Sequence, residues 1–400
     1  MISFNFGIPR LGLSRRSPYI DIPPVQTPDI ETAVEKQPRT VKHLVKANHA
    51  NNSIFYHNLQ FCNHFPHLVA SAYLFGADSR HLNDIYDHEN KQLEPWADSP
   101  GEISREDWRD FLGKREYQRA FVDFFEDQLV LHSYDWKELI HAYLLDGKGP
   151  LINNMIGALG HPLIHLGYAF ELSSPTLAIE ALAMTSCAHN FLHKYLDDPS
   201  YTKPSILAAS TPLDILGKIA QDPRFDLFST PGSGNIAPLF EAQEAAVLEY
   251  WNAWDLSNAK EQFEKSQEAA VAMLVGTHES DSKYDFFLVH LLTTSHAVRI
   301  VLPCIPAQHQ ISVVKQWWLL AIAVYIAQLR PKIDLGRING VDIKGRDWQS
   351  VDKAALTGKG ALDAHYVKAL RAMKEAAKTW GNERYYLSAA LGFIDGFGGW

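Results

Sequence analysis

Hydrophobic side chains recur every three or four residues along most of the chain from about residue 41 onward. This spacing gathers them on one face of an α-helix, so the pattern predicts helices. Runs of short alternating strands bounded by turn residues do not occur, which argues against all-β and βαβ architectures. Asp363 stands where the N-cap of the last predicted helix is expected. The predicted helical segments are residues 65–76, 117–131, 135–145, 176–196, 241–254, 257–275, 284–301, 311–330 and 363–379.

Proline, glycine and polar residues divide the chain. Residues 1–40 are rich in proline and polar groups and predict an extended arm that lies on the surface or is partly disordered. Further clusters at 147–150, 200–212 and 223–238 predict loops, and the last is the best candidate for a boundary between two halves. The helices on both sides of it have apolar faces that can share one core. We therefore predict one all-α domain of about ten helices over residues 41–400.

Composition and charge narrow the class of protein. Hydrophobic residues make up 46% of the 400 residues and charged residues 21%, enough to bury a large core. A net charge of -9 argues against nucleic acid or an anionic membrane as the main partner. The longest apolar run, residues 317–327, is too short to cross a bilayer and predicts a buried core helix.

The N-terminal segment and the cysteines bear on the compartment. Pro9 and Pro18 interrupt the first residues, which lack the continuous apolar stretch of a signal peptide. The three cysteines lie far apart and form no CxxC pair, so neither a disulfide framework nor a thiolate zinc site is indicated: Cys62, Cys187 and Cys304. We expect a cytoplasmic protein without a membrane span.

Histidines carry the most suggestive spacing. His161 and His165 are four residues apart, the arrangement by which one helix face gives two ligands to one metal. Pro162 biases His161 away from helical geometry, so His161 is expected at a helix start or a kink. His64 and His67 are three apart, around a proline that suits a first helical turn. For each of these residues the alternative is a core histidine that hydrogen-bonds to a backbone carbonyl.

The remaining histidines are more ambiguous. His189 and His193 repeat the four-residue spacing beside a polar run that indicates an exposed helix end, and His290 stands alone among Phe and Leu. Near the C-terminus His365, Lys368 and Arg371 are three apart and line one helix face. That face is either a solvated basic stripe or the margin of a buried surface.

Several familiar motifs are absent from the sequence. A ferritin-like di-iron bundle needs two Glu-x-x-His motifs, and only Glu138–His141 is present. HExxH, GxSxG and P-loop motifs do not occur. The glycine pair Gly232 and Gly234 follows no βαβ pattern and is better explained as a flexible loop. A flavin or nucleotide bound in the usual fold is therefore disfavoured.

Four segments together resemble the signature blocks of the questin oxidase-like family, in the expected order: NHFPHLVASAYLFGAD (63–78), GHPLIHLGYAFE (160–171), DFFLVHLLTTSHAV (285–298) and DAHYVKALRAM (363–373). Four ordered blocks are much more specific than any one of them. The resemblance implies an oxygenase that oxidatively opens a ring of an anthraquinone-like aromatic polyketide in secondary metabolism, with O2 as co-substrate.

Two mechanisms are attached to the family. One is a Baeyer–Villiger monooxygenation that uses NADPH without an evident flavin. The other is a dioxygenation by non-heme Fe(II), held by histidines and a carboxylated lysine. A buried lysine has a depressed pKa, so its neutral amine can add carbon dioxide and supply an anionic oxygen ligand. By the matching blocks, the resemblance implies iron ligation by His161, His165, His290 and one of His64 or His67, with Lys368 as the carbamate.

Other residues of the blocks have weaker assignments. His296 is six residues from His290, roughly 120° around a helix, so we expect it to line the pocket or contact a substrate hydroxyl. Tyr168, Phe286 and Phe287 could stack on a flat substrate. Cys62 stands where the family often has a histidine, which weakens a role for the first position of that block. A non-enzymatic helical scaffold or pathway partner with structural histidines is the remaining alternative.

Overall fold

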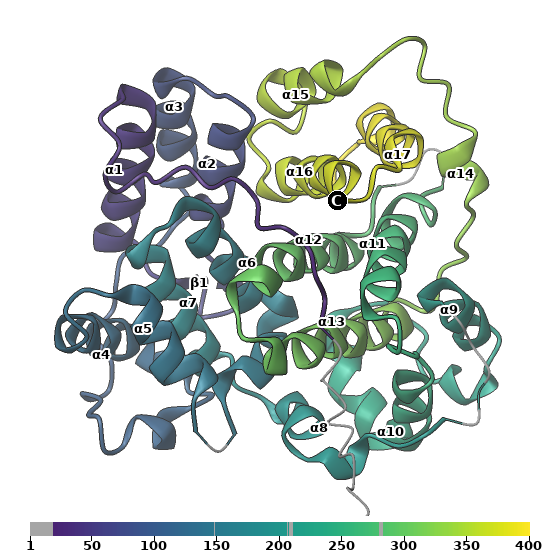
Figure 1. Ribbon diagram of the computed structural model, residues 1–400, viewed down its shortest axis with the longest axis horizontal. Coiled ribbons are helices and arrows are strands. Elements are labelled where there is room, and N and C mark those ends of the chain that lie inside the picture. The colour runs from purple at the N-terminus through teal and green to yellow at the C-terminus, as the bar shows by residue number, and fades with distance from the viewer. Residues whose placement is uncertain (1–18, 148, 206, 208–210, 280–282) are drawn as a thin grey trace, which may run out of the picture.

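The computed structural model describes residues 19–147, 149–205, 207, 211–279 and 283–400, and these are almost entirely helical (Figure 1). Seventeen α-helices occur among them, so the all-α prediction is confirmed and the expected number of about ten was wrong. The larger ones are α1 Lys36–Asn51, α2 Phe65–Leu74, α3 Ser79–Glu89, α4 Gln118–Leu131, α5 Trp136–Ile140, α6 Gly157–Leu172, α7 Pro175–Cys187, α9 Pro212–Ala220, α10 Ile236–Asn252, α11 Ala259–Val275, α12 Phe286–Val301, α13 Ala307–Ala327, α15 Trp348–Thr357, α16 Ala364–Trp380 and α17 Glu383–Gly396. Two single-turn helices, α8 Lys194–Asp197 and α14 Gly336–Asn339, complete the set.

The predicted number of helices was too low for two reasons. Helices such as α3 and α15 are short and lie in stretches of the chain where the apolar spacing covers only a few turns. The predicted segment 176–196 is also broken: α7 ends at Cys187, and the Asn190 side chain accepts the N–H of Leu192 and starts a new turn. In contrast, Asp363 caps α16 as predicted, because its Oδ1 accepts the N–H groups of His365 and Tyr366 at 2.8 and 3.0 Å.

Helix α12 lies at the centre of the molecule, where α6, α11, α13 and α16 pack around it (Figure 1). Buried side chains from Ile20 to Phe397 form one hydrophobic cluster. The helices before and after residues 223–238 both contribute to this cluster, and α10 packs against α13. One large core therefore positions the helices on both sides of residues 223–238.

Among the described residues, two helices are long and apolar enough to cross a membrane by length and composition: residues Phe286–Cys304 and Ala307–Ala327. The apolar run 317–327 is the second half of α13, so the run by itself underestimated the length of its helix. In each helix, 83% of the most apolar window is buried inside the fold. Most of the apolar surface of these helices is thus covered by other helices of the same chain.

The chain before α2 includes part of the predicted arm. Helix α1 begins at Lys36, inside the predicted arm, and residues 1–18 of that arm lie outside the described residues. The part from residue 19 is anchored, since the Ile20 N–H donates to Gln310 Oε1 on α13 at 3.0 Å. A small hairpin of β1 Phe55–Tyr56 and β2 Phe61–Cys62 follows α1 and leads directly into α2.

Helix α6 has an unusual start. Ala158, Leu159 and Gly160 have positive φ angles, and right-handed helical geometry begins at His161. A Cβ at Gly160 would lie 2.5 Å from Thr294 Oγ1, and a Cβ at Gly167 would lie 3.2 Å from Ala297 Cβ, both residues of α12. The predicted kink at His161 is confirmed, and the two glycines let α6 and α12 pack closely.

Candidate metal centre

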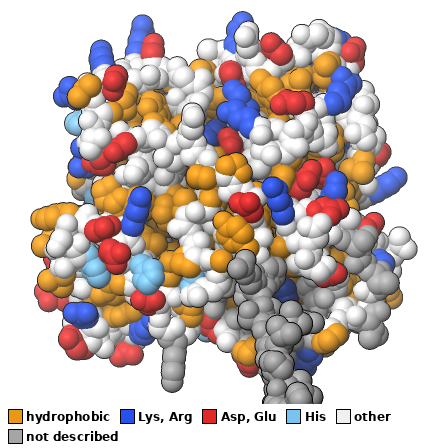
Figure 2. All heavy atoms as spheres, viewed as in Figure 1, with side chains coloured by type: hydrophobic (Ala, Val, Ile, Leu, Met, Phe, Trp, Pro, Cys, Tyr) orange, Lys and Arg blue, Asp and Glu red, His pale blue; other side chains and the backbone are white. Residues whose placement is uncertain are grey.

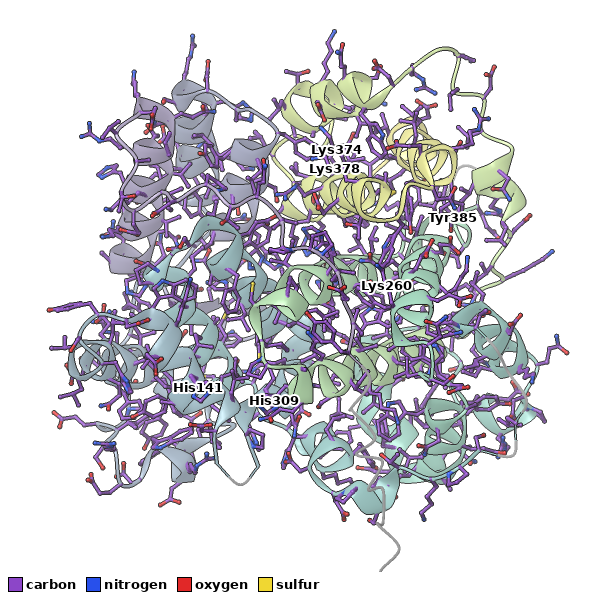
Figure 3. The ribbon with its side chains drawn as sticks, in the orientation of Figure 1. His141, Lys260, His309, Lys374, Lys378 and Tyr385 are labelled. Carbon is purple, nitrogen blue, oxygen red and sulfur yellow. The ribbon has the colours of Figure 1, made fainter. Side chains whose placement is uncertain are left out.

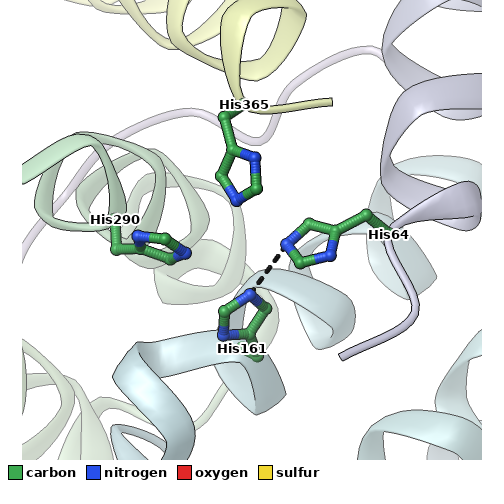
Figure 4. A group of neighbouring side chains, drawn as sticks. All are labelled: His64, His161, His290 and His365. Atoms are coloured by element: carbon green, nitrogen blue, oxygen red, sulfur yellow. Dashed lines mark hydrogen bonds between the residues drawn. The ribbon is translucent and has the colours of Figure 1, made fainter. Parts of the chain in front are cut away.

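Four histidine rings, three on helices and one just before a helix, point toward one another (Figure 4). His64 immediately precedes α2, His161 lies at the kink of α6, His290 on α12, and His365 in the first turn of α16. One ring nitrogen from each lies within 4.8 Å of the other three. Nitrogens that share one metal at about 2.0–2.1 Å each are at most roughly 4.2 Å apart, so only a small contraction would close this group on an ion.

Backbone carbonyls fix which nitrogen carries hydrogen in three of the four rings. Nδ1 of His64 bonds to the carbonyl of Cys62 at 2.6 Å, Nδ1 of His290 to that of Phe286 at 2.8 Å, and Nδ1 of His161 to that of Ala158. A carbonyl oxygen only accepts, so these Nδ1 atoms donate and the Nε2 atoms keep their lone pairs. On His365 the Nδ1 atom lies 3.7 Å from the Asp363 carboxylate.

The Nε2 lone pairs of His64 and His161 face each other, and neither nitrogen is expected to carry a proton. Nε2 of His64 and Nε2 of His161 are 2.8 Å apart, a separation at which two lone pairs repel unless a cation lies near them. Burial, with the positive charge of Lys368 next, lowers the pKa of both rings well below the usual value. Nε2 of His290 and of His365 are also buried without a hydrogen-bond partner among the described residues. The four nitrogens could together hold a divalent metal, and imidazole donors suit iron, zinc and copper.

The structure brings together only part of the ligand set implied by the resemblance. His64, His161 and His290 belong to the four-ring group, whereas His67 and His165 lie outside it. His365 takes a place in the group that the sequence reasoning did not assign. The available signal was its position in the last block, one turn before Lys368.

His165 is instead satisfied by other side chains. Its Nε2–H donates to Glu180 Oε2 at 2.7 Å, which leaves Nδ1 to accept from His67 Nε2 at 3.1 Å. The second oxygen of Glu180 accepts from His49 Nδ1 at 2.7 Å, and His49 Nε2 lies 3.1 Å from the half-exposed Glu126. A string of hydrogen bonds therefore runs from beside the four rings to the surface and explains how His165 is buried in an apolar segment.

This string predicts a pH-dependent stability. Burial opposes the charge of His49, but its hydrogen bonds to Glu126 and Glu180 outweigh burial and raise its pKa to about 9. The stabilisation is then fully present below the ordinary pKa of 6.5 and is lost as pH rises through about 9. We expect His49→Gln to lower the free energy of unfolding by roughly 2–3 kcal/mol at pH 6 and by much less at pH 10, measured by urea unfolding. A loss of equal size at both pH values would contradict this assignment.

Lys368 lies one turn after His365 on α16 and is 1% exposed. Its Nζ atom has no hydrogen-bond partner in the described part of the chain. Burial lowers its pKa to about 7, against the attraction of Asp363, Cys62 and Glu89. A large fraction of the amine is therefore neutral near pH 7, the form that can react with carbon dioxide.

The two side chains predicted as catalytic lie beside Lys368, in a cavity separate from the larger pocket next to the four rings. Tyr168 and His296 line a very small cavity together with Lys368 and Thr293. The Tyr168 hydroxyl is hydrogen-bonded to Ser71 Oγ at 2.6 Å, and both ring nitrogens of His296 are buried without a partner among the described residues. Neither residue lines the larger pocket beside the four rings.

A pocket of about 500 Å³ opens beside the four rings. His64, His161 and His290 contribute to its wall, and the rest is largely apolar. Phe286 and Phe287 line it as expected, whereas Tyr168 does not. A cavity of this size and character suits a drug-sized aromatic ligand.

His141, His189 and His193 lie outside the centre. The one Glu-x-x-His motif places His141 at the surface, near His309 (Figure 3), where pale blue side chains gather on the lower left of the molecule (Figure 2). His193 Nδ1 pairs with Asp197 at 2.7 Å, and the His189 ring packs against it. These residues do not join the four-ring group.

Comparison with known proteins places the chain in a family. The model of the family described as questin oxidase-like matches residues 61–373, more than three quarters of the chain. The chain belongs to the questin oxidase-like family. All four histidines and Lys368 lie inside the matched region.

Relatives of this questin oxidase-like chain carry the names of oxidising enzymes. A Baeyer-Villiger oxidase of Pestalotiopsis microspora is 24% identical over 84% of this chain and 80% of its own length. The oxidoreductase AflY of Aspergillus parasiticus is 27% identical over 82% and 71%. A questin oxidase of Aspergillus terreus is 22% identical over 36% of this chain and 34% of its own length. The chain is therefore an oxidoreductase, which argues against the scaffold alternative.

Proposed function

We propose that this chain binds one Fe(II) ion through His64, His161, His290 and His365 and uses O2 to cleave a ring of an anthraquinone-like aromatic polyketide. The single observation that supports it most is the meeting of four histidine ring nitrogens, with Nδ1 of His64, His161 and His290 turned outward to backbone carbonyls. Such outward hydrogen bonds orient histidine ligands of metals. Bound iron would supply Lewis acidity and the activation of O2.

The charge of the centre supports a role for Lys368. Four neutral imidazoles leave the two positive charges of Fe(II) unbalanced, and the group contains no carboxylate. The neutral Lys368 amine attacks carbon dioxide, a nitrogen–carbon bond forms and one proton leaves, so the lysine becomes a carbamate with one negative charge. That group supplies the anionic oxygen donor that an iron site of this kind takes.

The chain's own side chains prepare the substrate. The flat rings stack on Phe286 and Phe287 in the pocket of about 500 Å³, whose apolar wall excludes water. The names of the relatives support insertion of oxygen between a carbonyl carbon and its neighbour, the bond change of a Baeyer–Villiger oxidation. The carbon–carbon bond breaks, one atom of O2 is inserted, and the other leaves as water with two electrons and two protons from the reduced hydroquinone or from NADPH. The cytoplasmic location expected from the sequence agrees with an intracellular supply of substrate and reductant.

The test is metal analysis combined with oxygen uptake. Protein purified without added metal is expected to hold near-stoichiometric iron and to consume O2 with a hydroxyanthraquinone or its reduced hydroquinone. Chelation should abolish uptake, and Fe(II) should restore it. NADPH is varied in the same assay, because the metal-free alternative requires NADPH and keeps full activity after chelation. Full activity of the chelated protein would therefore overturn the iron proposal.

A further inference from the structure

A second pocket reaches the same histidines from another direction. It has a volume of about 550 Å³, and His64 and His365 line it. Phe61, His64 and Phe286 line both pockets, so the two pockets adjoin each other beside the four rings. Polar groups are more prominent here, and they come from α3, from the turn after it and from the loop before α16: His88, Glu89, Gln92, Lys359 and Asp363.

Glu89 is the unusual member of this lining. It ends α3, is only 5% exposed, and accepts one hydrogen bond, from Gln92 Nε2 at 3.1 Å. Lysine, arginine and histidine side chains do not form an ion pair with it among the described residues. A carboxylate at a helix C-terminus also faces the negative end of the helix dipole. A buried acid with one donor and no ion-pair partner is costly for stability, which favours a functional role.

The groups around Glu89 keep its proton exchangeable near neutral pH. Burial, and next the negative charge of Asp363, raise its pKa to about 7, while Gln92 and the positive charge of Lys368 act in the opposite direction. Tyr56 from β1 and His64 from the start of α2 line the same pocket, as do His88 and Lys359. The raised pKa of Tyr56 leaves its hydroxyl protonated at neutral pH. Glu89 is thus the carboxyl group of this pocket suited to accept and return a proton.

We propose that this second pocket binds the hydroxylated edge of the aromatic substrate and that Glu89 is the general base that takes the proton of a ring hydroxyl. This inference rests on the proposed function for the identity of the substrate. In the step, the hydroxyl O–H bond breaks, an O–H bond forms on Glu89, and the ring becomes an electron-rich aryloxide with no change of oxidation state. The aryloxide gives electrons more readily than the phenol, and Glu89 later returns the proton to a product oxygen.

The test uses Glu89→Gln, which keeps the shape and removes the base. Asp87→Asn, an exposed acid on the same helix, is the matched control. We expect Glu89→Gln to lower kcat for oxygen uptake by about 100-fold or more and to remove the rise of the wild-type rate through about pH 7. The Asp87→Asn variant should keep the wild-type kcat and the rise of the rate through about pH 7. Iron content and thermal midpoint, measured on each variant, show that the fold and the metal remain.

A binding measurement keeps the inference independent of turnover. The probe is 2-hydroxyanthraquinone, whose visible absorption moves to longer wavelength when its hydroxyl loses the proton. Wild-type protein at pH 7 is expected to bind it with the shifted band, and Glu89→Gln without it. An unchanged rate, pH profile and band in Glu89→Gln would overturn the role of Glu89 and leave the iron proposal intact. A wild-type protein that lacks iron and turnover but still shows the Glu89-dependent band would contradict the iron proposal alone.

Discussion

Replacing His365 by alanine is expected to weaken Fe(II) binding more than about 100-fold and to abolish oxygen uptake, whereas His165→Gln should leave the iron in place. His365 contributes one of the four ring nitrogens of the group, while both ring nitrogens of His165 already have partners in His67 and Glu180. Loss of an outer partner of a metal ligand typically costs 10–100-fold in affinity, and loss of a ligand costs more. Iron content of the purified variants measures the difference directly.

A thermal melt with and without Fe(II) gives an independent measure. At 100 times the dissociation constant, Fe(II) stabilises the wild-type fold by about 2.7 kcal/mol, and a 100-fold weaker site gains only about 0.4 kcal/mol at the same concentration. His189→Gln, which changes a histidine outside the four-ring group, serves as the control. The assignment fails if His165→Gln loses its iron while His365→Ala retains it.

The contrast between His165 and His365 shows how far the sequence reasoning reached. Spacing identified His161 and His165 as a pair, and Pro162 indicated the irregular helix start that the structure has at His161. The spacing does not say what faces the second histidine, because Glu180 comes from another helix. The four-residue pattern predicted two ligands for one metal, and the structure places His161 in the four-ring group and His165 outside it.

His365 was difficult for the opposite reason. Its neighbours Lys368 and Arg371 make the segment look like a charged surface stripe, yet Lys368 is 1% exposed and Arg371 8%. The burial results from the packing of α16 against α2, α12 and α17, contacts between segments that are far apart in the sequence. Resemblance to the family indicated that this block belongs to the site, but it assigned only the lysine.

The parts of the fold that depend on local sequence were predicted, and the parts that depend on long-range contacts were not. Helices with several turns of apolar spacing, such as α12 and α13, were predicted because periodicity is a local property. Glu89 was not singled out at all, because a lone acid at a helix end has no sequence signal. Its significance depends on the pocket that it shares with His64 and His365.

Lys368→Met is expected to lower both the iron affinity and oxygen uptake by about 100-fold or more, because it keeps a chain of similar size and removes the amine that forms the carbamate. Removal of carbon dioxide and bicarbonate from the buffer should lower the iron affinity and oxygen uptake of the wild-type protein in the same way. Added bicarbonate should restore both. The Lys368→Met variant should respond to neither treatment. Labelled bicarbonate allows the carbamate carbon to be observed directly by carbon-13 NMR.

Lys378→Met provides the matched control, since Lys378 lies on the same helix (Figure 3) with its side chain 63% exposed. That variant should keep its iron, its activity and the response to bicarbonate. The response of the wild-type protein to bicarbonate separates two roles of Lys368, as a carbamate and as a free amine. If Lys368→Met loses iron but the wild-type protein ignores bicarbonate, the amine acts without carbon dioxide. Because burial holds the Lys368 pKa at about 7 and leaves Nζ without a partner among the described residues, we expect the response to bicarbonate to be clear.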